Sequence, residues 1–139
     1  MKNGTERVRT VLRWLLAAAY LFVGIVHLRS PGGFLPIVPD WVPYPREVIL
    51  LTGVAEIAGA VGLMTGRFRR AAAWGLAAYA VCVFPANIKH AVEGVVIGGV
   101  KLSWAYHAPR LAFQPVIFWW ALFAGGIITW PFRQREPAP

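Results

Sequence analysis

The sequence predicts an all-α integral membrane protein, a four-helix bundle in a single domain that covers residues 1–139. Hydrophobic residues make up 58% of the chain, charged residues only 14%, and the mean hydropathy is +0.55. A water-soluble surface could hardly be built from so little polar material. Each of four apolar segments is long enough to cross a hydrocarbon layer of about 30 Å at about 1.5 Å per residue. These four predicted helices cover residues 11–28, 48–65, 71–88 and 111–130.

Basic residues are distributed unevenly between the two sides that four crossings create. The N-terminal stretch, the turn at 66–70 and the C-terminal stretch together carry nine Lys and Arg, whereas the other side carries five. By the positive-inside rule, both termini lie in the cytoplasm. We therefore expect a multi-pass protein of the plasma membrane, or of the inner membrane of a bacterium. The net charge of +8 then reflects topology and contact with anionic lipids, not nucleic-acid binding.

The two ends of the chain are polar. The first apolar segment resembles a secretory signal, but it is longer than a signal core and no small-residue cleavage motif follows it at 27–29, so we expect a retained signal anchor. Residues 1–10 are expected to be the frayed start of this helix, with the Arg13 side chain reaching back to the lipid headgroups. Residues 131–139 are expected to be a disordered tail.

The segment RSPGGFLPIVPDWVPYP at 29–45 holds five of the chain's eleven prolines. Such density excludes a regular helix and predicts a stiff, extended outer loop between the first and second helices. Its apolar side chains, among them Phe34 and Trp41, are too many for a loop that lies free in water. Two interpretations stay open: a lid folded over the mouth of the bundle, or an aromatic belt at the membrane interface.

The third predicted helix carries a proline close to an amide. The short turn at 66–70 makes the second and third helices antiparallel neighbours. Pro85 has no backbone N–H, so it should kink the third helix and free a carbonyl near Val81 at the depth of Asn87.

The outer segment that follows this helix carries charge and glycine. We expect Lys89, His90 and Glu93 to face the outer headgroups, and residues 95–102 to be extended or to form a short hairpin. The glycines of GVVIGG lack both the spacing and the strand-turn-helix context of a dinucleotide-binding loop.

One acid, Glu56, lies near the middle of the second apolar segment. An acid in hydrocarbon costs several kcal/mol unless it is neutral or paired, so it normally faces the protein interior. Its neighbours one helical turn away are Thr52, Gly53, Gly59 and Ala60, and small residues let another helix approach closely. Glu56 therefore points at other helices, where it either belongs to a functional site or only clamps two helices together.

Polar residues of the other three predicted helices lie near the same end of the membrane. His27, Asn87 and Gln114 are within about 5 Å of the outer ends of their helices, and Glu56 is about 12 Å deep. Arg110 precedes Gln114 by four residues and shares its face. We therefore predict one polar cluster of these five residues, with Arg110 as the counter-ion of Glu56, or with the two amides satisfying a protonated Glu56.

Other chemistry finds little support in the sequence. Cys82 is the single cysteine, so the chain has no disulfide framework and no thiolate metal cluster of its own. There is no motif for flavin, haem pairing, zinc or a catalytic nucleophile. We expect no metal, and no cofactor other than a lipophilic molecule such as a quinone or another lipid.

Several short motifs together resemble one known family. They are the helix exit at 27–31, IVPDWVPYP at 37–45, GVAEIAGAVGLM at 53–64, RRAAAWG at 69–75, FPANI at 84–88, and the spacing of Arg110, Gln114 and Trp119. Between about residues 20 and 120 the chain resembles the DoxX-like membrane proteins. The resemblance implies a four-helix membrane bundle and places Glu56 and Asn87 in the family's polar signature. Members are linked to a thiosulfate:quinone oxidoreductase subunit, to redox-stress membrane complexes and, in distant animal relatives, to receptor assembly.

Three hypotheses follow for the function. The first is a binding or accessory protein that holds a quinone-like or isoprenoid ligand near Glu56, or presents its outer face to a soluble redox enzyme or another membrane subunit. The second is a small intramembrane enzyme in which Glu56 is the general acid or base, assisted by His27 or Arg110. The third is a purely structural or assembly protein. A homo-oligomer is compatible with all three.

Overall fold

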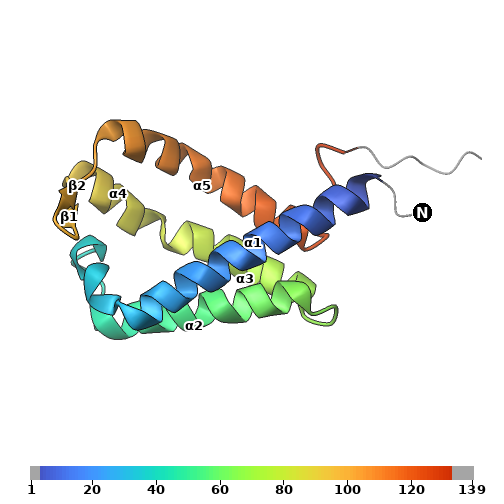
Figure 1. The fold of residues 1–139 in the computed structure, drawn as a ribbon, viewed down its shortest axis with the longest axis horizontal. Coiled ribbons are helices and arrows are strands. Elements are labelled where there is room, and N and C mark those ends of the chain that lie inside the picture. The colour runs from blue at the N-terminus through green and yellow to red at the C-terminus, as the bar shows by residue number, and fades with distance from the viewer. Residues whose placement is uncertain (1–3, 133–139) are drawn as a thin grey trace, which may run out of the picture.

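The computed structural model describes residues 4–132, and this part of the chain is mostly helical (Figure 1). Three long helices are followed, after a break, by a short helix, a two-stranded hairpin and a last long helix. In chain order the elements are α1 (Gly4–Arg29), η1 (Pro31–Gly33), η2 (Leu35–Ile37), α2 (Pro45–Met64), α3 (Arg69–Cys82), α4 (Phe84–Val92), β1 (Val96–Ile97), β2 (Val100–Lys101) and α5 (Trp104–Ala124).

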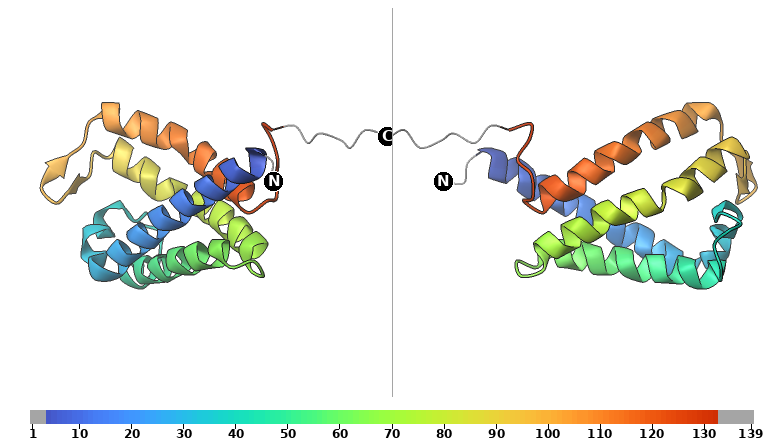
Figure 2. Two further views of the ribbon diagram at one scale, coloured as in Figure 1. Left: turned by 45° about the vertical axis from the view of Figure 1, so that its right-hand side comes forward. Right: turned by 180° about the vertical axis from the view of Figure 1, so that it is seen from behind.

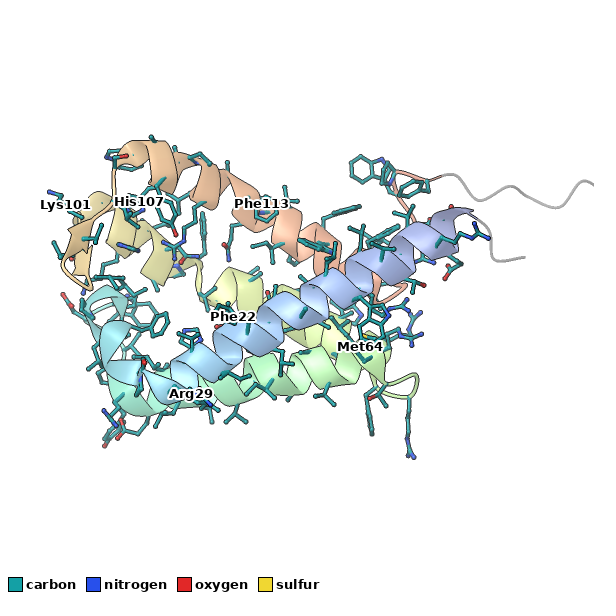
Figure 3. The ribbon with its side chains drawn as sticks, viewed as in Figure 1. Phe22, Arg29, Met64, Lys101, His107 and Phe113 are labelled. Atoms are coloured by element: carbon teal, nitrogen blue, oxygen red, sulfur yellow. The ribbon has the colours of Figure 1, made fainter. Side chains whose placement is uncertain are left out.

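Three stretches are long and apolar enough to cross a membrane: Gly4–Arg29, Pro45–Met64 and Arg69–Val92, the last of which contains both α3 and α4. Large apolar side chains point outward from them, as Phe22 does at 69% exposure (Figure 3). An apolar outer face of this extent is typical of contact with lipid. The structure thus supports a helical protein with at least three candidate membrane spans within residues 4–132.

The helices converge at one end of the molecule and splay apart at the other (Figures 1 and 2). At the convergent end, where α1 begins and α5 ends, the core is built of small and branched apolar residues. Gly125, just after α5, lies so close to α3 that an added Cβ would come 2.1 Å from the Cβ of Ala73. The core cluster consists of Leu16, Leu63, Ala73, Leu76, Ala77, Ala121, Leu122 and Ala124. Small residues allow tight packing here and leave room at the splayed end.

The first helix is longer than predicted, and its basic residues have a different role. It begins at Gly4, so a frayed start is wrong for residues 4–10, while residues 1–3 lie outside the described part. Arg13 is only 8% exposed and donates from Nε to the carbonyl oxygen of Ala124 at 2.8 Å, so its side chain is held against the end of α5 and does not extend freely as predicted. Arg9 Nε donates to the carbonyl oxygen of Phe123 at 3.0 Å. Both guanidinium groups thus donate to carbonyl oxygens at the end of α5, where that of Phe123 also accepts from the backbone N–H of Gly126.

The last helix begins and ends several residues earlier than the predicted 111–130. It runs from Trp104 to Ala124 and stops where Gly126 adopts a positive φ of 72°. The prediction of a disordered tail is wrong for Phe132, whose ring lies 5.5 Å from that of Phe123. Residues 133–139 of the predicted tail lie outside the described part.

Three local predictions are confirmed. The predicted kink at Pro85 corresponds to an interruption at Val83, between the end of α3 at Cys82 and the start of α4 at Phe84. Helices α2 and α3 are joined by the short predicted turn. Residues 95–102 contain the antiparallel hairpin β1–β2, whose turn is made by Gly98 and Gly99 at φ values of 58° and 79°.

Candidate ligand-binding site

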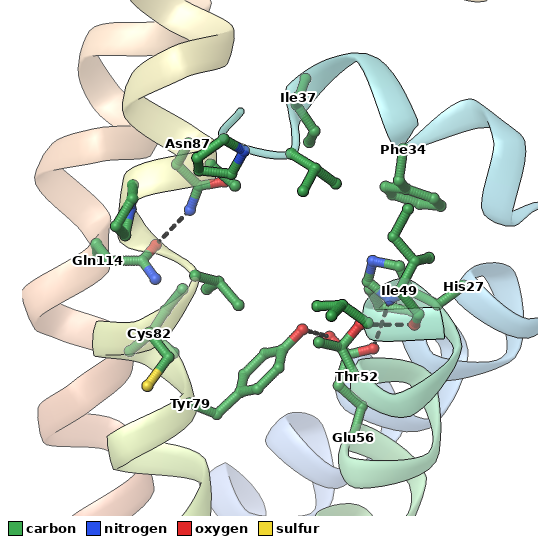
Figure 4. Close-up of a pocket in the computed structure, with 18 of the residues that line it drawn as sticks. His27, Phe34, Ile37, Ile49, Thr52, Glu56, Tyr79, Cys82, Asn87 and Gln114 are labelled. Carbon is green, nitrogen blue, oxygen red and sulfur yellow. Dashed lines mark hydrogen bonds and ion pairs between the residues drawn. The ribbon is translucent and has the colours of Figure 1, made fainter. Parts of the chain in front are cut away.

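A cavity of about 520 Å³ opens at the splayed end of the helices (Figure 4). Its lining comes from α1, the outer loop, α2, α3, α4 and α5, and most of it is apolar. Polar side chains gather on two walls that face each other. One wall is centred on Glu56 and the other on Asn87 and Gln114.

Glu56 is the centre of the first wall and is 2% exposed. Its Oε2 lies 2.6 Å from Nδ1 of His27 on α1, and its Oε1 accepts a hydrogen bond of 2.7 Å from the hydroxyl of Tyr79 on α3. Each carboxylate oxygen therefore has a partner on a different helix. A buried charge needs such partners, because desolvation alone would make it costly.

The small residues beside Glu56 allow this arrangement, as their pattern in the sequence predicts. An added Cβ at Gly59 would lie 2.4 Å from a methyl carbon of Leu76, so α3 packs against the bare backbone of α2 at this point. Tyr79 follows Leu76 by three residues and Glu56 precedes Gly59 by three, so the same contact brings the hydroxyl to the carboxylate.

His27 is held from two sides. Glu56 fixes its Nδ1, and the ring of Phe34 lies over it at a centroid distance of 4.1 Å. The imidazole lines the cavity with its side chain 12% exposed. A ring fixed at Nδ1 presents its other nitrogen to whatever occupies the site.

The second wall is an ordered chain of hydrogen bonds between α4 and α5. Arg110 donates from Nη2 to Asn87 Oδ1 at 2.6 Å, and Asn87 Nδ2 donates to Gln114 Oε1 at 3.2 Å. Gln114 Nε2 in turn donates to the carbonyl oxygen of Ala80 at 2.7 Å. This carbonyl is one residue before Val81, where the kink at Pro85 was predicted to leave a free acceptor.

All five residues predicted from the sequence line this one cavity, but they do not form one cluster. The predicted pairing of Arg110 with Glu56 is wrong, because Glu56 is held by His27 and Tyr79, whereas Arg110 binds Asn87 and His90. Helix depth, on which the prediction rested, says nothing about which walls of a splayed bundle face each other. Within residues 4–132 no group of three or more His, Cys, Asp and Glu side chains is placed to hold a metal.

The sequence did not reveal two further parts of the site. Nothing in the spacing of polar residues marks Tyr79 as part of the site, although it and Tyr20 are the only tyrosines inside the four predicted helices. His90 was expected to face the headgroups and is instead 3% exposed, with Nδ1 3.0 Å from Arg110 Nη1. Its ring lies 4.7 Å from that of His107, which is 2% exposed and lies at the hairpin end of the molecule (Figure 3).

The outer loop lies over the cavity and is not extended as predicted. It forms the two 3-10 turns η1 and η2, each with a proline in its first turn. Lys89 on α4 ties it down, since Nζ donates to the carbonyl oxygen of Val38 at 2.9 Å and to Asp40 Oδ1 at 2.5 Å. This placement favours the lid interpretation, and Trp41, which also lines the cavity, is 74% exposed.

Residues 16–124, well over half of the chain, match the family described as "Domain of unknown function (DUF8561)", and the chain belongs to this family. No curated protein and no solved structure matches the chain. The likeness to the DoxX-like proteins stays a prediction that these comparisons do not test.

Proposed function

We propose that this member of the DUF8561 family is a multi-pass membrane protein that binds a lipophilic small molecule with a quinone-like head group. One observation carries the proposal: two hydrogen-bonding walls face each other across an apolar cavity of about 520 Å³. Concave apolar sites with a few convergent polar groups are the usual form of small-molecule sites in proteins.

The chemistry of the cavity fits a flat ring with oxygen atoms at opposite ends. The apolar lining suits the ring and the start of an alkyl tail, and the walls around Glu56 and Arg110 each offer hydrogen bonds to one end. A pure isoprenoid chain would leave the remaining N–H donors of Arg110, Asn87 and Gln114 without a partner, which is unfavourable for polar groups that line an apolar cavity. A quinone-like head group therefore fits better than a plain hydrocarbon.

The test is to purify the protein, extract its bound lipids and identify them by mass spectrometry. We expect a lipophilic molecule in stoichiometric amount, lost in Glu56→Gln. Glu47→Gln is the matched control, because Glu47 also lies on α2 but is exposed, and it should retain the ligand. An empty cavity in the wild-type protein, after mild extraction, would contradict the proposal.

The proposal includes four crossings with both termini in the cytoplasm. Helix α5 has 21 residues, about 31 Å of helix, which is enough to cross the hydrocarbon layer despite its polar first turns. It ends beside the start of α1, where Trp120 Nε1 donates to the carbonyl oxygen of Leu12 at 2.9 Å. The nine-to-five excess of basic residues supports the orientation.

Cysteine labelling in cells tests this topology. In a Cys82→Ser background, Ser103→Cys should react with an impermeant maleimide from outside. Thr5→Cys and Phe132→Cys should react only after permeabilisation. Labelling of Phe132→Cys but not of Thr5→Cys from outside would mean that α5 does not cross, and labelling of both from outside would reverse the orientation.

A second candidate function is acid–base catalysis on the bound molecule. It is favoured by the His27 ring, which Glu56 and Phe34 hold at the edge of the cavity in the manner of a positioned proton acceptor. A variant that retains the ligand but loses turnover would distinguish this candidate from binding alone. A soluble redox enzyme, another membrane subunit and a second copy of the chain remain the candidate partners.

A further inference from the structure

The two polar walls of the cavity differ in the kind of hydrogen bond that they can still make. A wall that has used its donors can only accept from a ligand, and a wall that has used its acceptors can only donate. The pattern of hydrogen bonds within the protein therefore describes the ligand that would complement it. This inference rests on the proposed function and extends it to the chemical form of the head group.

The wall around Glu56 has acceptors left and few donors. An ionised carboxylate only accepts, and it already receives the Tyr79 hydroxyl and the Nδ1 side of His27. Tyr79 has then used its one proton, and in the tautomer that donates from Nδ1 to Glu56 the His27 ring presents a lone pair on Nε2. The nearby hydroxyl of Thr52 donates to the carbonyl oxygen of Ile49 at 2.7 Å, so it too is left with lone pairs.

The wall around Arg110 is the opposite. A guanidinium has five N–H donors and no acceptor, and two of these donors are used by His90 and Asn87, which leaves three. Asn87 and Gln114 each keep one amide N–H, and each of their oxygens accepts one hydrogen bond and keeps one lone pair, so the remaining donors of this wall outnumber its remaining acceptors. Within residues 4–132 no carboxylate forms an ion pair with Arg110.

We propose that the head group carries a hydroxyl donor at the Glu56 end and an acceptor oxygen at the Arg110 end. A hydroquinone, or a related phenol with a carbonyl or carboxylate opposite its hydroxyl, meets both requirements. An oxidised quinone has only acceptors, so one of its oxygens faces lone pairs of Glu56, His27 and Tyr79. The cavity therefore selects the reduced form over the oxidised form of the same ring system.

Direct binding measurements test this selection. The probe is one decyl-substituted para-benzoquinone and its hydroquinone, kept reduced under anaerobic conditions and titrated into the purified protein. Binding is followed by tryptophan fluorescence, since Trp41 lines the cavity. Because a hydrogen bond to a charged group separates the two forms, the hydroquinone should bind at least about tenfold more tightly.

Variants show whether the preference comes from the predicted wall. Glu56→Gln places an amide donor where there was a carboxylate, so the preference for the hydroquinone should fall to about equal affinity. Glu47→Gln should retain the wild-type ratio. Tyr79→Phe removes the hydroxyl that donates to Glu56, so it should change the ratio of the two affinities less than Glu56→Gln does. Tyr20→Phe is its control, because it removes a hydroxyl from the same cavity lining and should retain the wild-type ratio.

The possible outcomes separate the two proposals. If neither form binds the wild-type protein, the quinone-like site itself is wrong. If both bind equally, or the quinone binds more tightly, the site stands and the selection of the reduced form is overturned. The wild-type comparison decides this even where a variant fails to fold.

Discussion

Gly24 of α1 and Gly53 of α2 lie against each other backbone to backbone. An added Cβ at Gly24 would come 2.8 Å from the carbonyl oxygen of Gly53, and one at Gly53 would come 2.9 Å from that of Gly24. Each glycine also lies against the polar residue of the other helix, since an added Cβ at Gly53 would come 2.9 Å from the Cβ of His27 and one at Gly24 would come 3.1 Å from that of Glu56. The glycine contact therefore sets the distance of 2.6 Å between the imidazole and the carboxylate.

Gly53→Ala should separate α1 from α2, because the new methyl group meets backbone that cannot move aside. We expect a loss of about 1–3 kcal/mol in the free energy of unfolding and weaker ligand binding. Thermal unfolding in detergent measures the first effect. Gly75→Ala on α3 is the control, since its Cβ meets nothing within 4 Å, and it should be neutral or slightly stabilising. Equal unfolding temperatures for Gly53→Ala and wild type would contradict the close contact.

Arg13→Met should destabilise the protein by about 1–3 kcal/mol, because the carbonyl of Ala124 at the end of α5 loses its charged donor. Arg7→Met is the matched control, since Arg7 lies on the same helix, is exposed, and makes no side-chain hydrogen bond within the described residues. Chemical unfolding of both variants, followed by circular dichroism, gives the comparison. If the two substitutions have equal effects, Arg13 does not hold the end of α5.

Gln114→Leu should lower the free energy of unfolding by about 1–3 kcal/mol. The carbonyl oxygen of Ala80 loses the donor Nε2 of Gln114, and Nδ2 of Asn87 loses the acceptor Oε1. A double-mutant cycle with Asn87→Ala measures the interaction free energy between the two side chains. We expect the two losses to be clearly less than additive. Strict additivity would show that the two amides act independently.

Lys89→Gln should loosen the outer loop over the cavity, because it removes the contacts to Asp40 and to the carbonyl of Val38. Cys82 is exposed, so access is measured in a Cys82→Ser background with Ile49→Cys, which places a thiol on the cavity lining at a position that is 4% exposed and whose rate of reaction with a small thiol reagent reports entry. We expect faster labelling by no more than about fivefold, because an ion pair with an exposed partner contributes little. Asp40→Asn should act in the same direction, and unchanged labelling in both variants would show that this tie does not control entry.

The sequence was sufficient for features whose causes are local. Apolar length predicts the helices, Pro85 predicts the kink between α3 and α4, and the segment 95–102 is predicted to be extended or a short hairpin, of which the structure has the hairpin. The position of Glu56 among small residues in an apolar segment also indicates a buried acid. The free-energy cost of placing a carboxylate in hydrocarbon depends on the residue type and its depth alone. These properties belong to single segments and need no knowledge of neighbours.

Only the tertiary structure decided which side chains meet. It set Tyr79 against Glu56, moved Arg110 to the opposite wall, buried His90, and directed Arg13 to the end of α5. The physical reason is that helix depth follows from counting residues, whereas the partner across a helix contact depends on where the helices touch and where they diverge. In this chain glycine and alanine contacts draw the helices together at one end, and the space left at the other end is the cavity.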